Sequence, residues 1–209
     1  FRFGIAVSGT HGKTTTTSLI VQILSEAKLD PTYIIGGIIN ATGMNAKLGN
    51  SDYLIAEADE SDASFLHLQP MLSVITNIDE DHMATYNHNY EKLTEAFINF
   101  TSNLPFYGIC VACTDDQGVR DILKKIHRPV LSYGFGNDAD VKALNISQDK
   151  MKMTFDVSCQ KYQKSFPVSL NLIGRHNILN ALAAISVSLE LDINIEDIQK
   201  ALSHFSGVS

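Results

Sequence analysis

Residues 8–15 read Ser-Gly-Thr-His-Gly-Lys-Thr-Thr, and they follow the apolar run Phe-Gly-Ile-Ala-Val at 3–7. The apolar run predicts a buried strand over 3–8, and the pattern after the glycines predicts a helix over 13–27. Gly9 and Gly12 permit tight turns and a close approach of the backbone to a ligand. A strand, a glycine-containing loop and a helix in this order are typical of α/β proteins that hold an anion at a helix N-terminus.

The residue types in this loop predict a nucleoside triphosphate as its ligand. Unpaired N–H groups and the helix dipole attract a polyphosphate. Lys13 can reach the terminal phosphates, and Thr14 can offer its hydroxyl to the magnesium ion that accompanies ATP. Because only two residues separate the glycines, where the usual loop has four before its Gly-Lys pair, an ordinary strand–helix turn is the alternative. We expect ATP and Mg²⁺ at Gly9, Thr10, His11, Gly12, Lys13, Thr14 and Thr15.

Composition narrows the class of protein. The chain has 209 residues, 44% of them apolar, which suffices for a substantial core. A net charge of −7 argues against a nucleic-acid partner, which normally meets a basic patch. No apolar run reaches the length of about 18 residues that a membrane helix needs, so no membrane partner is expected. The opening strand, without the features of a signal peptide, and the lack of a disulfide framework favour the cytoplasm.

Two of the three cysteines form a Cys-x-x-Cys pattern, at Cys110 and Cys113. Residues three apart on a strand point to opposite faces. We therefore expect both thiols to be core residues that share neither a metal nor a disulfide.

Apolar strands alternate with helical patterns over the first two thirds of the chain. This alternation predicts an α/β fold, a mostly parallel sheet of the P-loop type flanked by helices. The strands are expected at 3–8, 33–36, 53–58, 72–77, 108–112 and 130–133, and the helices at 13–27, 90–103 and 116–126.

The pattern changes after residue 134. Alternating residues at 141–146, 151–159 and 162–170, joined by polar turns, predict a small antiparallel meander over about 140–170. Two helices are expected to follow, at 174–191 and 195–204.

Acidic residues follow the strand expected at 53–58, where the sequence reads Glu-Ala-Asp-Glu-Ser-Asp-Ala-Ser from Glu57 to 64. Ligands of parallel sheets bind at the carboxyl ends of strands, which is also where the loop after 3–8 lies. A carboxylate there can hold magnesium opposite the phosphates. The alternative is a solvated acidic loop, and Glu57 is the best candidate because it is nearest the strand.

The next strand is followed by Ile-Asp-Glu-Asp-His at 78–82, so His82 is expected at the same edge. A histidine there can bind a second divalent ion or contact a phosphate. The alternative is an exposed or structural histidine, and only the neighbouring phosphate loop and Glu57 favour the functional role.

Four segments together resemble the central, ATP-binding domain of the Mur ligase family: Gly-Thr-His-Gly-Lys-Thr at 9–14, Glu-Ala-Asp-Glu-Ser-Asp at 57–62, Thr-Asn-Ile-Asp-Glu-Asp-His at 76–82 and Gly-Arg-His-Asn-Ile-Leu-Asn at 174–180. The resemblance extends over residues 1–209 in order. It implies that an N-terminal domain for the uridine nucleotide and a C-terminal domain for the amino acid lie outside this chain.

The resemblance implies a role for each candidate residue. Lys13 and Thr14 would hold the phosphates and the first magnesium ion, with Glu57 as a ligand of that ion and His82 as a ligand of a second. Asn and His at a helix start can also be caps, but the resemblance places three of them against the adenine: His176, Asn177 and Asn180.

Two positions depart from the family pattern. Ala84 stands where an aspartate is frequent, and Phe97 stands where several relatives carry a modified lysine. Modified-lysine chemistry is therefore not expected, and the remaining ligands of the second metal stay open.

Within the family, residues 57–70 are most similar to the branch that joins L-alanine to UDP-N-acetylmuramate, a peptidoglycan precursor. The substrate carboxylate would attack the γ-phosphoryl group of ATP, and the amine of L-alanine would displace phosphate from the acyl phosphate. Lys13, Glu57 and His82 would be the catalytic residues. The alternatives are a murein-peptide recycling ligase, which typically has tyrosine in place of Ser61, a P-loop ATPase or switch, and a binding module.

Overall fold

The chain alternates strands and helices before it ends in a meander and two helices. The computed structural model describes residues 3–61, 64–81 and 83–208. Its elements are, in chain order, β1 (Phe3–Ser8), α1 (Lys13–Glu26), β2 (Thr32–Ile39), β3 (Met44–Lys47), β4 (Tyr53–Glu57), η1 (Ser64–His67), β5 (Leu72–Ile75), η2 (Met83–Tyr86), α2 (Tyr90–Ser102), β6 (Ile109–Cys113), α3 (Gln117–Leu123), β7 (Val130–Gly134), β8 (Val141–Asp149), β9 (Lys152–Cys159), β10 (Lys164–Leu170), α4 (Arg175–Glu190) and α5 (Ile195–His204).

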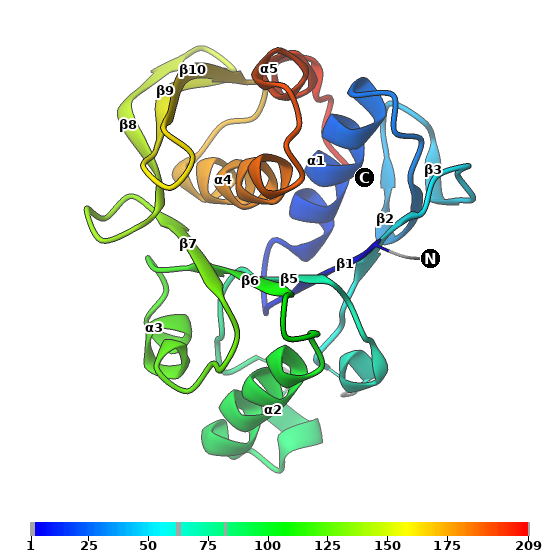
Figure 1. Ribbon diagram of the computed structural model, residues 1–209, viewed down its shortest axis with the longest axis vertical. Helices are drawn as coiled ribbons and strands as arrows, with labels where there is room; N and C mark the ends of the chain where they lie inside the picture. Colours follow the sequence, from blue (N-terminus) through cyan, green and yellow to red (C-terminus); the bar gives the residue numbers. More distant parts are fainter. Residues whose placement is uncertain (1–2, 62–63, 82, 209) are drawn as a thin grey trace.

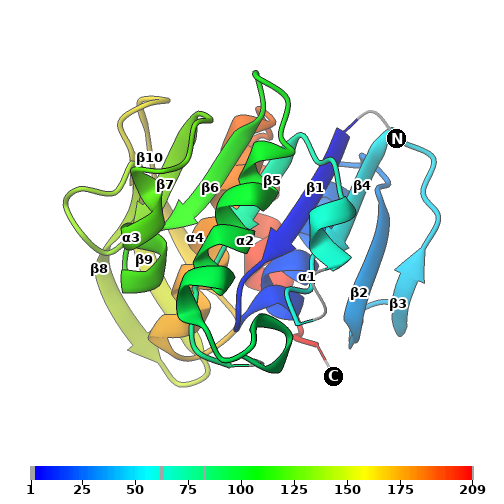
Figure 2. The same cartoon turned by 90° about the horizontal axis from the view of Figure 1, so that it is seen from below.

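Within the described residues, all strands belong to one ten-stranded sheet of order β10-β9-β8-β7-β6-β5-β1-β4-β2-β3. Neighbouring strands are parallel from β8 to β2 in this order. At one edge β3 pairs antiparallel with β2, and at the other β9 pairs antiparallel with both β8 and β10. Figures 1 and 2 show this sheet and the turn of its meander end toward α4 and α5. The expected α/β fold with a mostly parallel sheet and an antiparallel meander is confirmed.

Helices cover both faces of the parallel part. In Figure 1, α1, α4 and α5 lie on one side of the sheet, and α2 and α3 lie on the other. Each side has its own apolar core, and Cys113 belongs to the first core whereas Cys110 belongs to the second. The two thiols therefore face opposite sides of the sheet, as expected, and both are free.

The largest difference from the expected elements lies at β2 and β3. We expected this strand at 33–36, but β2 pairs with β4 only as far as Ile34 and then runs on to Ile39 beside β3. All four residues of β3 are exposed, so they carry no buried periodicity from which the strand could be predicted. Smaller differences are that β5 ends at Ile75 and that α3 is shorter than expected.

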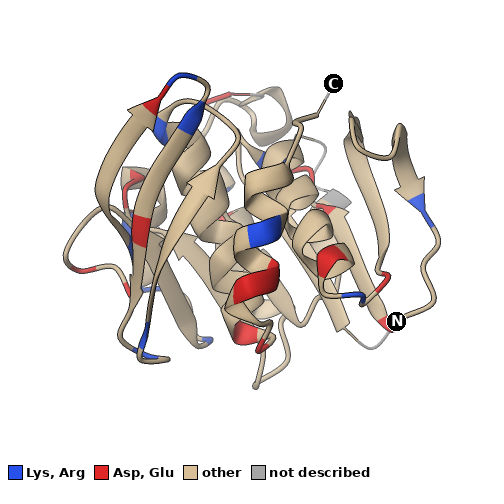
Figure 3. Ribbon diagram, turned by 90° about the horizontal axis from the view of Figure 1, so that it is seen from above, with Lys and Arg blue, Asp and Glu red and all other residues tan. Residues whose placement is uncertain are grey.

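No helix among the described ranges is long and apolar enough to span a membrane. In Figure 3, lysine and arginine residues are spread over several elements and are interleaved with aspartate and glutamate.

The strand register brings the loops of interest together. Val7 of β1 lies opposite Glu57 of β4, and Ser8 lies opposite Ile75 of β5. The carboxyl ends of these three neighbouring strands therefore share one edge of the sheet, from which the chain enters α1, the acidic segment and the loop that leads to η2.

Candidate functional site

The predicted phosphate loop, residues 8–15, leads into the N-terminus of α1, which has no side-chain cap. Gly12 is the N-cap of α1, with φ of 81°, and in the described part of the chain this helix start has no side-chain cap. The N–H groups of that turn are therefore free of side-chain competition for an anion. Thr15 is half-buried in the same turn.

Both loop glycines lie where a larger residue would collide with its neighbours. A Cβ at Gly9, where φ is 128°, would be 2.1 Å from Thr76 Oγ1. A Cβ at Gly12 would be 2.5 Å from Asn180 Oδ1. The loop is therefore tightly packed against the segment that follows β5 on one side and against α4 on the other.

The segment after β5 holds the middle of the phosphate loop. The His11 backbone N–H donates to Asn77 Oδ1 at 2.7 Å, and Thr76 Oγ1 donates to the His11 carbonyl at 2.7 Å. The Asp79 N–H donates to the hydroxyl of Thr10 at 2.9 Å, and the exposed ring of His11 lies 3.2 Å from Asp81 Oδ2. Thr10 and His11 thus shape the loop, and their contact with a nucleotide stays a prediction.

Thr14 and Glu57 meet at the edge of the sheet. The Thr14 hydroxyl donates to Glu57 Oε2 at 3.2 Å, and the Gly36 N–H donates to Glu57 Oε1 at 2.8 Å. The extension of β2 beyond β4 supplies that N–H. The structure therefore brings together two of the three residues that the sequence predicts as magnesium ligands.

The donor set of this pair suits magnesium. A hydroxyl and a carboxylate are hard oxygen ligands, and Mg²⁺ commonly takes one or two protein ligands beside water and phosphate oxygens. Within the described residues, no group of three His, Cys, Asp or Glu side chains could hold a metal. The third predicted ligand, His82, lies outside the described residues.

Lys13 turns back over the loop. Its Nζ donates to the Gly9 carbonyl at 2.7 Å and to Glu60 Oε2 at 3.0 Å. Only 14% of the Lys13 side chain and 1% of the Glu60 side chain are exposed. Sequence reasoning singled out Glu57 and missed Glu60, since nothing in a run of acids shows which of them turns inward.

A cavity of about 210 Å³ lies between the phosphate loop and the start of α4. His176 and Asn180 line it, together with His11 and the buried ring of Tyr133. The Tyr133 pKa is raised well above its usual value by burial, so its hydroxyl stays protonated. Sequence reasoning missed Tyr133, whose only signal is its place near the carboxyl end of β7.

The three predicted adenine residues are not placed alike. Asn180 Oδ1 accepts from Thr16 Oγ1 at 3.3 Å, and Asn180 Nδ2 donates to Asn177 Oδ1 at 3.2 Å. Asn177 Nδ2 bonds the Ile173 carbonyl at 2.8 Å, and Asn177 is not among the cavity's lining residues. Neither residue caps α4, whose start at Gly174 has no side-chain cap. The contact of all three with adenine stays a prediction.

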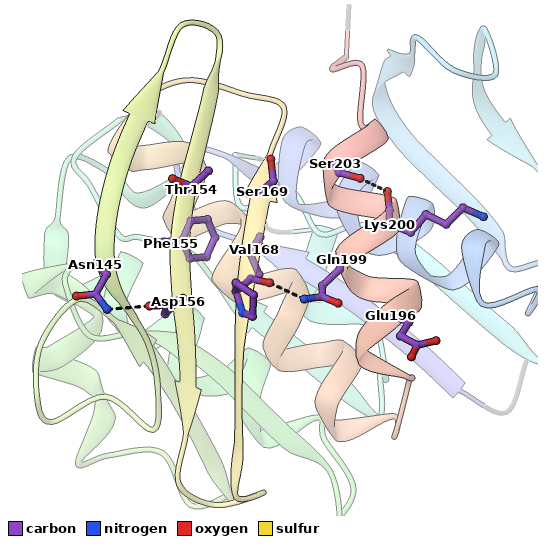
Figure 4. Close-up of a pocket in the computed structure, with 11 residues that line it drawn as sticks. Asn145, Thr154, Phe155, Asp156, Val168, Ser169, Glu196, Gln199, Lys200 and Ser203 are labelled. Carbon is purple, nitrogen blue, oxygen red and sulfur yellow. Dashed lines mark hydrogen bonds between the residues drawn. The ribbon is translucent and has the colours of Figure 1, made fainter.

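The larger hollow of about 630 Å³ lies elsewhere, between the β9–β10 hairpin and α5 (Figure 4). Gln199 of α5 bonds the Pro167 carbonyl across it at 2.7 Å. None of the predicted site residues lines it, so its size does not make it the candidate site.

A phosphate loop, an acidic strand end and a cavity at α4 are the features that the Mur ligase resemblance implies. The model of the Mur ligase middle domain matches residues 7–188. The chain belongs to the Mur ligase family.

Two curated proteins similar to this Mur ligase domain have the same name. UDP-N-acetylmuramate–L-alanine ligases from Vesicomyosocius okutanii and Dichelobacter nodosus are 67% and 56% identical to it over 209 residues. Those residues are 100% of this chain but 45% and 44% of the two relatives. The chain therefore spans less than half the length of the curated relatives that it matches.

Solved structures agree with this placement. UDP-N-acetylmuramate-alanine ligase from Thermotoga maritima matches 99% of the Mur ligase domain and 46% of its own chain, with a TM-score of 0.86 and 26% identity. A UDP-N-acetylmuramate:L-alanyl-γ-D-glutamyl-meso-diaminopimelate ligase from Neisseria meningitides matches 100% of the domain and 67% of its own chain, with a TM-score of 0.88 and 29% identity.

Proposed function

We propose that residues 1–209 are the ATP-binding domain of a longer ligase that joins L-alanine to UDP-N-acetylmuramate. The contact of Thr14 with Glu57 at the uncapped start of α1 carries the proposal, because it supplies oxygen ligands for magnesium beside a phosphate site. The names of the relatives at 67% and 56% identity support the choice of substrates.

In the proposed reaction the muramate carboxylate attacks the γ-phosphorus of ATP, which releases ADP and leaves an acyl phosphate. The amine of L-alanine then attacks the acyl carbon, and phosphate leaves. Lys13 stabilises charge on the phosphoryl group during its transfer. Magnesium, when bound, would neutralise phosphate charge, with Thr14 and Glu57 as its ligands and His82 as a ligand of a second ion.

The cavity between the phosphate loop and α4 is where we place the adenine. Its position next to Gly12 would let one nucleotide reach both features. His176 and Asn180 offer polar edges to the base, whereas Asn177 supports Asn180.

We place the protein in the cytoplasm, where ATP is made and thiols stay reduced. The three cysteines are buried and free, which fits that compartment. The uridine nucleotide and the amino acid would bind to parts of the protein outside residues 1–209.

The test uses the full-length protein with ATP, Mg²⁺, UDP-N-acetylmuramate and L-alanine. The expected product is UDP-N-acetylmuramoyl-L-alanine, with one ADP and one phosphate for each amide formed. Ligation of a preformed L-alanyl-γ-D-glutamyl-meso-diaminopimelate in place of L-alanine would instead assign the recycling reaction. Phosphate release that needs no acceptor would indicate an ATPase or switch, and binding of ATP without turnover would indicate a binding module.

A further inference from the structure

The carboxylate of Glu60 lies buried beside the phosphate loop and is not explained by the proposed metal site. Both of its oxygens contact one cation, since Lys13 Nζ lies 3.0 Å from Oε2 and 3.3 Å from Oε1. With 1% of its side chain exposed, Glu60 has lost its water shell. A carboxylate in that position must be offset by a charged partner, and Lys13 is that partner.

Lys13 has three N–H donors, and the two shortest contacts of its Nζ use two of them, with Asp59 Oδ1 farther away at 4.0 Å. One donates to the Gly9 carbonyl at 2.7 Å, and one donates to Glu60. The Thr10 carbonyl, at 3.5 Å, is at the limit of hydrogen-bond distance. Two short contacts at one nitrogen fix the direction in which the remaining N–H points.

The backbone holds Glu60 in place. The Tyr86 hydroxyl donates to the Glu60 carbonyl at 2.6 Å, and Tyr86 is itself buried. The Ser61 N–H donates to Asp59 Oδ1 at 2.9 Å, which orders the turn that follows. These bonds hold the backbone at Glu60, and the bonds from Lys13 Nζ hold its carboxylate.

A buried carboxylate next to a polyphosphate site repels the anion. It weakens the attraction that Lys13 alone would exert, so the pair contributes less to holding ATP than a free lysine would. What the pair can contribute is the orientation of the Lys13 ammonium group, because a fixed ammonium group can point at the charge that develops during phosphoryl transfer.

We propose that Glu60 is a positioning residue for Lys13, which it orients toward the transferring phosphoryl group. Glu60 acts through Lys13 and touches neither the nucleotide nor the metal. This inference rests on the proposed function for the reaction, but its binding measurements do not require ligase activity.

The first experiment compares Glu60→Gln with the parent in the full-length protein. Glutamine keeps the size and one acceptor oxygen but removes the charge. We expect kcat to fall about 10–100-fold, the size of loss that follows removal of the hydrogen-bond partners of metal ligands. ATP affinity by calorimetry, measured without acceptor substrates, should be equal or tighter because a repulsive charge is gone. The exposed Glu95→Gln on α2 is the control for loss of one carboxylate.

Two results would overturn the inference, and a third would bear on the proposed function alone. A raised Mg²⁺ midpoint with weaker ATP binding would make Glu60 a metal ligand. An unchanged kcat with a lowered melting temperature would leave Glu60 with a structural role alone. A protein that binds ATP as described but ligates nothing would refute the proposed function, and the binding measurements would still test the pair.

The second experiment asks whether Glu60 acts through Lys13. Lys13→Met alone should lower the melting temperature, because Glu60 is left buried without its partner. Adding Glu60→Gln should restore part of that loss. Glu60→Gln should change the ATP affinity of Lys13→Met by no more than it changes the ATP affinity of the parent. An additional loss of affinity in the double variant would show that Glu60 contacts the nucleotide or metal directly, and would refute the proposal.

Discussion

The hydroxyl of Thr14 and the carboxylate of Glu57 lie 3.2 Å apart, joining the first turn of α1 to the end of β4. The two residues are 43 positions apart in the chain. Their meeting depends on the parallel pairing of β1 with β4, which sets Val7 opposite Glu57. The register of β1 and β4 therefore brings the oxygen ligands of Thr14 and Glu57 together.

Glu57→Gln in the full-length protein should raise the Mg²⁺ concentration needed for half-maximal ligation by about 10-fold or more. The amide removes the charge that a hard cation needs but retains an oxygen that can accept from the Gly36 N–H. The measurement is a Mg²⁺ titration of initial rates at saturating ATP. The exposed Glu95→Gln serves as the control, and equal midpoints in Glu57→Gln and the parent would remove Glu57 from the metal site.

Lys13→Ala should lower kcat by about 10²–10³-fold, because a charged donor to the transferring phosphoryl group is lost. The variant should also unfold at a lower temperature than the parent, since the buried Glu60 loses its partner. Steady-state rates and a thermal melt check the two effects. The exposed Lys125→Ala is the matched control, and parental turnover in Lys13→Ala would contradict the role given to Lys13.

Gly9→Ala should destabilise the protein more than Gly43→Ala does. Both glycines have positive φ, but a Cβ at Gly43 has nothing within 4 Å, whereas one at Gly9 meets Thr76 Oγ1 at 2.1 Å. Gly43→Ala therefore measures backbone strain alone, about 1–2 kcal/mol, or about 2–4 °C of melting temperature for each kcal/mol. Comparable melting temperatures in the two variants would mean that the loop is not packed against Thr76 as described.

Alkaline pH should destabilise the fold through its buried thiols. Burial raises the pKa of Cys110 to about 12 and that of Cys113 to about 11, from 9.0. Between pH 9 and these values the folded protein keeps protons that the unfolded chain releases, so the free energy of unfolding falls as pH rises. Urea unfolding at pH 8 and pH 10 measures this fall. It should be smaller in Cys110→Ala, and an equal fall in both proteins would exclude Cys110 as a cause.

The sequence predicts the elements well wherever burial imposes a period. The helices at 13–27 and 195–204 are found as α1 and α5, within a residue at each end. The exposed strand β3 has no such period, because neither of its faces is buried. Its hairpin with β2 is fixed by edge pairing, which local pattern does not encode.

In the candidate site, too, some residues could be predicted from the sequence and others could not. Glycine spacing and the ends of strands point to Lys13, Thr14 and Glu57, because these positions follow from the register of a parallel sheet. The carboxylate of Glu60 turns inward to Lys13, 47 residues away, and Tyr86, 26 residues away, holds the Glu60 backbone carbonyl. Such a contact between two loops has no periodic signature in the sequence, so only the structure reveals it.

The bond between Thr16 and Asn180 crosses 164 residues of sequence. During synthesis the phosphate loop leaves the ribosome long before α4 exists, and Gly12 then has no asparagine beside it. Contacts of such separation form late, because the loop they close is costly in entropy. We therefore expect the proposed nucleotide site to be complete only when nearly all of the domain has been made, and we expect ATP to stabilise the finished domain rather than its early folding intermediates.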